Sequence, residues 1–105
     1  MGFETEPTGY RKTVLSDLQG AWQNLRDAVA DQPGFPNWER ALFHIDEAMS
    51  WESVRNLQAM YRALVVVRNL LIHDEVPEEV RIRLDDVNVA MEETLQALTD
   101  GEIPR

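Results

Sequence analysis

The chain has 105 residues, of which 44% are hydrophobic, and this suits one globular domain with a single core. It contains no cysteine, so disulfide bonds, thiolate zinc sites and thiol catalysis are excluded. The formal net charge of −9 opposes broad nonspecific binding to nucleic acid, because phosphate contacts need a positive surface. Any RNA-binding site must therefore be confined to a small positively charged part of the surface.

No stretch of the sequence reaches the roughly 18 consecutive apolar residues of a membrane span. The first residues also lack the basic start and the apolar core of a signal peptide. We therefore expect a cytoplasmic protein with no membrane contact. A single domain over residues 1–105 is expected, with flexible ends at 1–7 and 102–105.

The first predicted helix begins near Pro7, between the cap-capable hydroxyls of Thr5 and Thr8. Its apolar residues then recur at steps of three and four as far as Ala28, which is the pattern of an amphipathic helix. Residues 31–36 contain two prolines and a glycine and end it.

Asn37 can cap a short second helix, which is expected to end near Met49. Ser50 then restarts the chain as the N-cap of a third helix that runs to about Ile72. The second half of this third helix is apolar nearly all round, and such a segment is either central in its domain or covered by another subunit. Its β-branched run at residues 65–67 could form a strand, but long periodic flanks without Gly or Pro favour a helix.

The last predicted helix begins around Pro77, with two glutamates in its first turn, and ends at Asp100 and Gly101. Ile82 and Val89 lie off its main apolar stripe, and they serve either stripe-edge packing or a partner contact. Together the four segments predict an all-α fold, namely an antiparallel four-helix bundle with a short second helix.

The chemistry of the chain is concentrated at Arg68 and His73, at the end of the third helix. A guanidinium can hold a phosphate while an imidazole moves protons near neutral pH, so this pair can cleave a phosphodiester without a metal. Five residues on a straight helix separate two side chains by about 140°. The pair can converge only if the helix ends before His73 or if two copies meet across a two-fold axis.

Asn69 and His73 share a helix face, and Arg62 lies seven residues before Asn69, so these three could form one polar substrate-binding stripe. Purely structural roles stay open as well. Arg68 could pair with an acidic residue of a neighbouring helix, Asn69 could bond a loop carbonyl, and His73 could cap the helix end.

Arg68, polar Asn69 and His73 resemble the signature of the HEPN family, small all-α nucleotide-binding domains whose motif is Arg, four to six residues, then His. The resemblance covers the motif and the helix layout. It implies a homodimer through the third helix, with Arg68 binding the scissile phosphate, His73 acting as acid or base, and Asn69 orienting. HEPN toxins paired with nucleotidyltransferase antitoxins carry Tyr two residues past the His, and Glu75 stands there in this chain.

Other chemistry is less marked in the sequence. His44 reads as a packed or surface histidine, and the acidic pairs of the last helix read as a solvated face, because no His accompanies them at metal-binding spacing. No metal and no cofactor is expected.

Two functions follow. The first is a HEPN-like, metal-independent endoribonuclease or RNA- or nucleotide-binding component of a toxin-antitoxin or defence system. The alternative is a noncatalytic acidic module that binds a protein partner, as a small subunit, phage adaptor or antitoxin.

Overall fold

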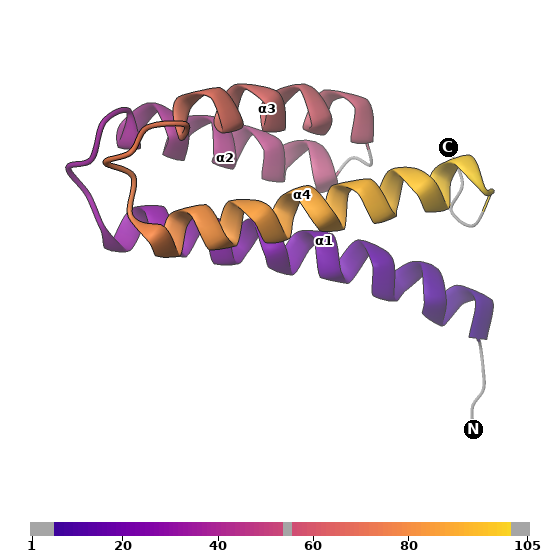
Figure 1. Ribbon diagram of the computed structural model, residues 1–105. Coiled ribbons are helices and arrows are strands. Elements are labelled where there is room, and N and C mark those ends of the chain that lie inside the picture. Colours follow the sequence, from indigo (N-terminus) through magenta and orange to yellow (C-terminus); the bar gives the residue numbers. More distant parts are fainter. Residues whose placement is uncertain (1–5, 54–55, 102–105) are drawn as a thin grey trace.

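The computed structural model describes residues 6–53 and 56–101, and these form four helices and no strand (Figure 1). Side chains are described for residues 14–51 and 56–101. The helices are α1 (Glu6–Asp31), α2 (Trp38–Ser53), α3 (Leu57–Leu70) and α4 (Glu78–Thr99). The all-α helical bundle predicted from the periodicity is therefore confirmed.

The helices pack in two layers. α1 lies mainly against α4, and α2 lies mainly against α3, while α3 and α4 contact each other little. Figure 1 shows the α1–α2 and α3–α4 connections at one end of the molecule, and the end of α2 and the start of α3 at the other. This arrangement places the end of α3 beside the start of α2.

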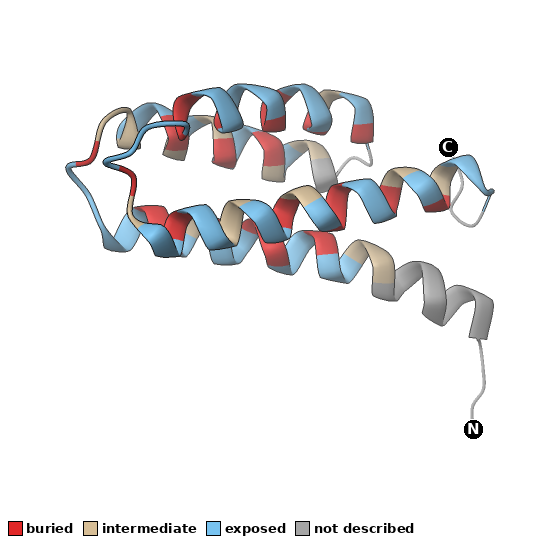
Figure 2. Cartoon of the chain, viewed as in Figure 1, coloured by how far each residue is buried: buried red, intermediate tan, exposed pale blue. Residues whose placement is uncertain are grey.

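One hydrophobic core draws on all four helices and on the connections between them (Figure 2). Its largest side chain is Trp22 of α1, which is fully buried, and Val76 anchors the α3–α4 connection. Burying a side chain of this kind contributes about 1.5–3 kcal/mol, so the core residues carry most of the stability. Leu18, Leu25, Ile45, Met60, Leu64, Val80, Val87 and Met91 are among its fully buried members.

The ends of α1 and α4 agree with the sequence. Pro77 occupies the N-cap of α4, and Asp100 is its C-cap. Gly101 follows with φ +81°, a left-handed conformation that glycine adopts without strain. The predicted flexible ends fall mostly outside the described residues, although Glu6 and Pro7 lie in α1.

The predicted boundary between the second and third helices is wrong. α2 continues through Ser50 and spans 16 residues, whereas α3 spans 14, so the second helix is not the short one. The Ser50 hydroxyl donates to the Glu47 carbonyl at 2.7 Å inside α2 and does not cap a new helix. Asn56 caps α3 instead, since its side chain accepts from the Ala59 N–H at 3.0 Å.

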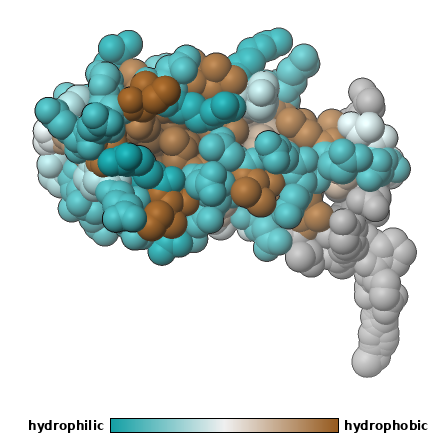
Figure 3. Space-filling view, viewed as in Figure 1, coloured by the Kyte–Doolittle hydropathy of each residue, from teal (hydrophilic) through white to brown (hydrophobic). Residues whose placement is uncertain are grey.

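α3 is buried on one side only. Leu64 and Val67 lie in the core, while Val65 and Val66 are exposed. Ile72, just past the helix end, is 78% exposed. Figure 3 shows apolar side chains at the surface over α3 and α4. The nearly all-apolar segment is therefore not central in the single copy, and its outer side is open.

An ion pair fastens α1 to α2 at the surface. Arg26 Nε lies 2.6 Å from Asp46 Oδ1, and the hydrogen bond and charge of Asp46 raise the pKa of Arg26. Such exposed pairs contribute about 0.2–1 kcal/mol, so the bundle depends on its core. Within the described part of the chain, no helix combines the length and apolarity needed to cross a membrane.

Candidate functional site

The end of α3 sets the geometry of the predicted Arg68–His73 site. The helix ends at Leu70, and the Leu71 N–H closes the last turn by donating to the Val67 and Arg68 carbonyls at 3.0 and 3.2 Å. His73 therefore stands in the α3–α4 connection and is released from helical register. This is one of the two conditions under which the sequence allows Arg68 and His73 to reach a common site.

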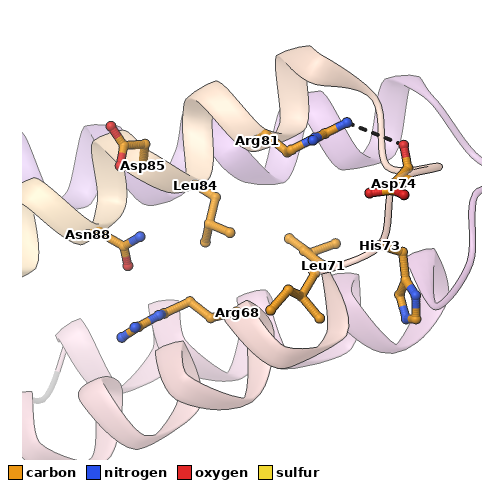
Figure 4. Close-up of a pocket in the computed structure, with 9 residues that line it drawn as sticks. Arg68, Leu71, His73, Asp74, Arg81, Leu84, Asp85 and Asn88 are labelled. Carbon is orange, nitrogen blue, oxygen red and sulfur yellow. Dashed lines mark hydrogen bonds between the residues drawn. The ribbon is translucent and has the colours of Figure 1, made fainter.

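A pocket of about 430 Å³ lies between the end of α3 and α4 (Figure 4). A second pocket, of about 440 Å³, continues along the same two helices. Arg68, Asp85 and Asn88 line both pockets, so we call the pair the α3–α4 groove. The first pocket is lined by Arg68, Leu71, Ile72, His73, Asp74, Arg81, Leu84, Asp85 and Asn88. The groove exists because α3 and α4 hardly touch.

Arg68 lies where the two pockets meet. Its side chain is exposed and has no hydrogen bond or ion pair within the described part of the chain. In Figure 4 its guanidinium extends along the groove on the side of Asn88, away from His73. The structural alternative, a salt bridge to a neighbouring helix, is therefore not formed among these residues.

His73 is exposed and lies at the opposite end of the pocket. Its ring Nε2 is 3.3 Å from Nδ2 of Asn37, a residue of the α1–α2 connection. The same Asn37 nitrogen donates to the Leu70 carbonyl at 3.4 Å. Asn37 therefore joins the start of α2 to the end of α3 and to the imidazole.

The sequence predicts Asn37 only as the cap of the second helix. Its backbone does stand there, because the Asn37 carbonyl accepts from the Ala41 N–H at 2.8 Å. Its side chain, however, contacts α3. This role is long-range, so helix-capping rules could not find it. A positive φ of 68°, which Asn tolerates better than most residues, accompanies this contact.

Arg81 of α4 holds the connection that carries His73. Its Nε and Nη2 donate to the Val76 carbonyl at 3.3 and 3.2 Å, and Nη2 donates to the Asp74 carbonyl at 3.2 Å (Figure 4). Sequence reasoning missed this residue. The available signal was a cation near a helix N-terminus, where the helix dipole disfavours positive charge and another partner is needed.

The structure brings Arg68 and His73 to one pocket, but it does not bring Arg62 or Asn69 there. Both of these are exposed on α3 and line neither pocket of the groove. Asp74 and Asp85 also line the first pocket, beside Arg68 and Arg81. The pocket is therefore of mixed charge, in contrast to the acidic chain as a whole.

Asn88 contributes a polar group to the groove floor. Its Oδ1 is buried and has no hydrogen-bond partner in the described structure. A buried acceptor of this kind is costly unless a donor reaches it. Two of the residues that line both pockets, Asn88 and Arg68, thus include a buried acceptor without a donor and an exposed cation without a partner in the described residues.

The other polar clusters have local explanations. His44 Nδ1 lies 3.0 Å from Glu47 Oε1, and the His44 ring packs edge-on against Phe43. On α4, Arg83 pairs with Glu79 at 2.8 Å and with Asp86 at 3.6 Å. Among the described residues, no group of three or more His, Asp or Glu side chains is placed to hold a metal ion.

The chain matches no protein-family model, no curated protein and no solved structure. The HEPN resemblance therefore stays a prediction, carried by Arg68, Asn69 and His73 and by the helix layout.

Proposed function

We propose that this protein is a cytoplasmic, HEPN-like homodimer that binds RNA in the α3–α4 groove and cleaves it without a metal ion. The observation that carries the proposal is Arg68, a cation without a partner in the described residues, in a pocket that His73 also lines. An unpaired guanidinium in an acidic protein suits a phosphate, which it can hold with two parallel hydrogen bonds.

In this proposal, Arg68 and His73 of one functional site come from two different copies of the chain. In one copy the Arg68 guanidinium extends away from His73, so the two groups do not converge on one phosphate (Figure 4). A two-fold axis beside α3 would bring Arg68 of one copy toward His73 of its partner. We propose that this shared arrangement is the functional site. Each copy would be an antiparallel bundle whose connections alternate between the two ends.

The exposed side of α3 is the surface at which we expect a second copy to bind. Val65, Val66 and Ile72 are exposed there, and burying them would favour association. These contacts have to overcome the repulsion between two chains of charge −9.

The chemistry needs only groups that the chain supplies. Arg68 would hold the phosphate and offset its developing negative charge. Cleavage by the neighbouring 2′ hydroxyl forms a bond from the 2′ oxygen to phosphorus and breaks the bond to the 5′ oxygen. One proton leaves the 2′ hydroxyl and one reaches the 5′ oxygen. His73 would transfer a proton, a role typically worth about 10²–10⁴-fold in rate.

The test is cleavage of single-stranded RNA in the presence of EDTA. Wild-type protein is expected to give products with 2′,3′-cyclic phosphate ends, and Arg68→Ala and His73→Ala are expected to lose the activity while keeping the helical content. Arg40→Ala, an exposed arginine of α2 outside the groove, is the matched control and should retain activity. Wild-type protein that neither binds nor cleaves RNA would refute the proposal.

The mixed charge of the pocket favours one second candidate, a noncatalytic module that binds a protein partner. Asp74 and Asp85 line the pocket and would repel RNA, whereas they would attract a basic protein. A stable complex with a basic protein encoded by a neighbouring gene, formed by protein that does not bind RNA, would establish this function. The neighbouring gene would also tell a toxin-antitoxin or defence role from a phage adaptor.

A further inference from the structure

Asn37 is the residue through which the start of α2 contacts the His73 imidazole. Its side-chain amide nitrogen lies between two atoms of the α3 end, the Leu70 carbonyl oxygen at 3.4 Å and His73 Nε2 at 3.3 Å. The orientation of the amide is fixed by the first contact. A carbonyl oxygen only accepts, so the Asn37 atom that faces Leu70 must be the NH₂ group.

The second contact then determines the state of the imidazole. The NH₂ group of Asn37 can donate two hydrogens and cannot accept, so His73 has to accept through Nε2. A neutral imidazole that accepts at Nε2 carries its proton on Nδ1. Nδ1 has no partner in the described residues, and it is therefore the nitrogen left for a ligand.

We propose that Asn37 is a positioning residue that holds His73 in the Nδ1–H tautomer. The ring then presents an N–H donor, and a phosphate oxygen held by Arg68 of the partner copy would accept from it. This is the form that binds the phosphate, and proton transfer by His73 would require the ring to give up its contact with Asn37. The phosphate as the ligand rests on the proposed function. The tautomer and its cause do not, because they follow from Asn37 and Leu70 alone.

The backbone at position 37 restricts which residues can stand there. Asn37 has φ 68°, in the left-handed region that Gly, Asn and Asp adopt far more readily than other residues. On the far side of the connection, Arg81 donates to the Asp74 and Val76 carbonyls. The His73 ring thus contacts a side chain from the α2 side, and the residues that follow His73 are held by Arg81 from the α4 side.

The same φ gives a matched pair of variants. Asn37→Asp keeps the size and the left-handed backbone but replaces the donor with acceptors, so His73 should turn to the Nε2–H form. Asn37→Gly keeps the backbone and removes the side chain, so the ring should show a mixture of the two tautomers. Both variants should fold, because neither one strains the φ angle or empties the core.

The measurement is ¹H–¹⁵N NMR of the His73 ring under alkaline conditions that leave the imidazole neutral. Wild-type protein should show a protonated Nδ1 and an unprotonated Nε2. Asn37→Asp should exchange the two signals, and Asn37→Gly should give averaged ones. A wild-type ring protonated on Nε2, or ring signals that are the same in all three proteins, would overturn the proposal.

RNA binding distinguishes this inference from the proposed function. With a single-stranded RNA oligonucleotide as probe, Asn37→Asp should bind about tenfold more weakly, because one hydrogen bond to a charged group is lost. Gln32→Glu adds the same charge in the same α1–α2 connection and controls for repulsion. If wild-type protein shows the expected tautomer but does not bind RNA, phosphate is not the ligand of the site, whereas the positioning role of Asn37 stands. If Asn37→Asp and Gln32→Glu weaken RNA binding equally, the loss comes from the added charge, and the Nδ1–H group of His73 does not donate to the RNA.

Discussion

Replacing Ile72 with aspartate tests the proposed dimer at its most exposed apolar side chain. Ile72 follows the last turn of α3 and is 78% exposed in the single copy. An exposed side chain contributes little to the folding of one chain, so Ile72→Asp should change the free energy of unfolding of the monomer by no more than about 0.5 kcal/mol.

The effect on association should be much larger. Burying one isoleucine contributes about 1.5–3 kcal/mol, and a two-fold interface buries two copies of it, which makes about 3–6 kcal/mol. Each 1.4 kcal/mol is a factor of ten, so Ile72→Asp should raise the dissociation constant of the dimer by about 10²–10⁴-fold. The added carboxylate increases this cost, because it would be buried without a partner.

Sedimentation velocity over a range of protein concentrations measures this shift. Wild-type protein should sediment as a dimer, and Ile72→Asp should sediment as a monomer at the same concentration. Phe43→Asp is the matched control, because Phe43 is 66% exposed on α2, away from the proposed interface, and should leave the dimer intact. A monomeric wild-type protein, or equal sedimentation of wild type and Ile72→Asp, would refute the reasoning.

Three further predictions concern the stability of the bundle around the site, and urea denaturation measures the free energy of unfolding in each case. Arg81→Ala removes the hydrogen bonds to the Asp74 and Val76 carbonyls and should cost about 1 kcal/mol, and an unchanged midpoint would show that they do not hold the connection. Leu64→Ala opens a cavity in the core and should cost about 2–5 kcal/mol, so a loss below 1 kcal/mol would contradict its burial. Asn56→Ala removes the cap of α3 and should cost about 1 kcal/mol, whereas no loss would argue for a different start of this helix.

The sequence was sufficient where one local rule decided the outcome. Pro77 and Gly101 mark the two ends of α4, because proline suits a helix start and glycine suits the residue just past a helix end. It failed where two residues satisfied the same rule. Ser50 and Asn56 can both cap a helix, and the hydroxyl of Ser50 bonds back into α2, whereas Asn56 accepts from the first turn of α3.

The candidate site shows the same limit. The sequence could place Arg68 and His73 near the end of one helix, because that depends on spacing and on Pro77. It could not show that Arg68 extends away from His73, or that Asn37 reaches His73 across 36 residues of chain. Those facts depend on which helices are neighbours. The sequence also could not tell which valine of residues 65–67 faces the core, since all three are equally apolar, and only Val67 is buried.

The central claim is that one functional site combines Arg68 of one copy with His73 of the other. Mixing Arg68→Ala protein with His73→Ala protein tests this directly, because each variant alone lacks one member of every site. If the pair is shared between copies, half of the randomly formed dimers contain one intact site, and RNA cleavage in EDTA should return to about a quarter of the wild-type activity. If each site forms within one copy, the mixture should stay as inactive as its components, and that result would contradict the account.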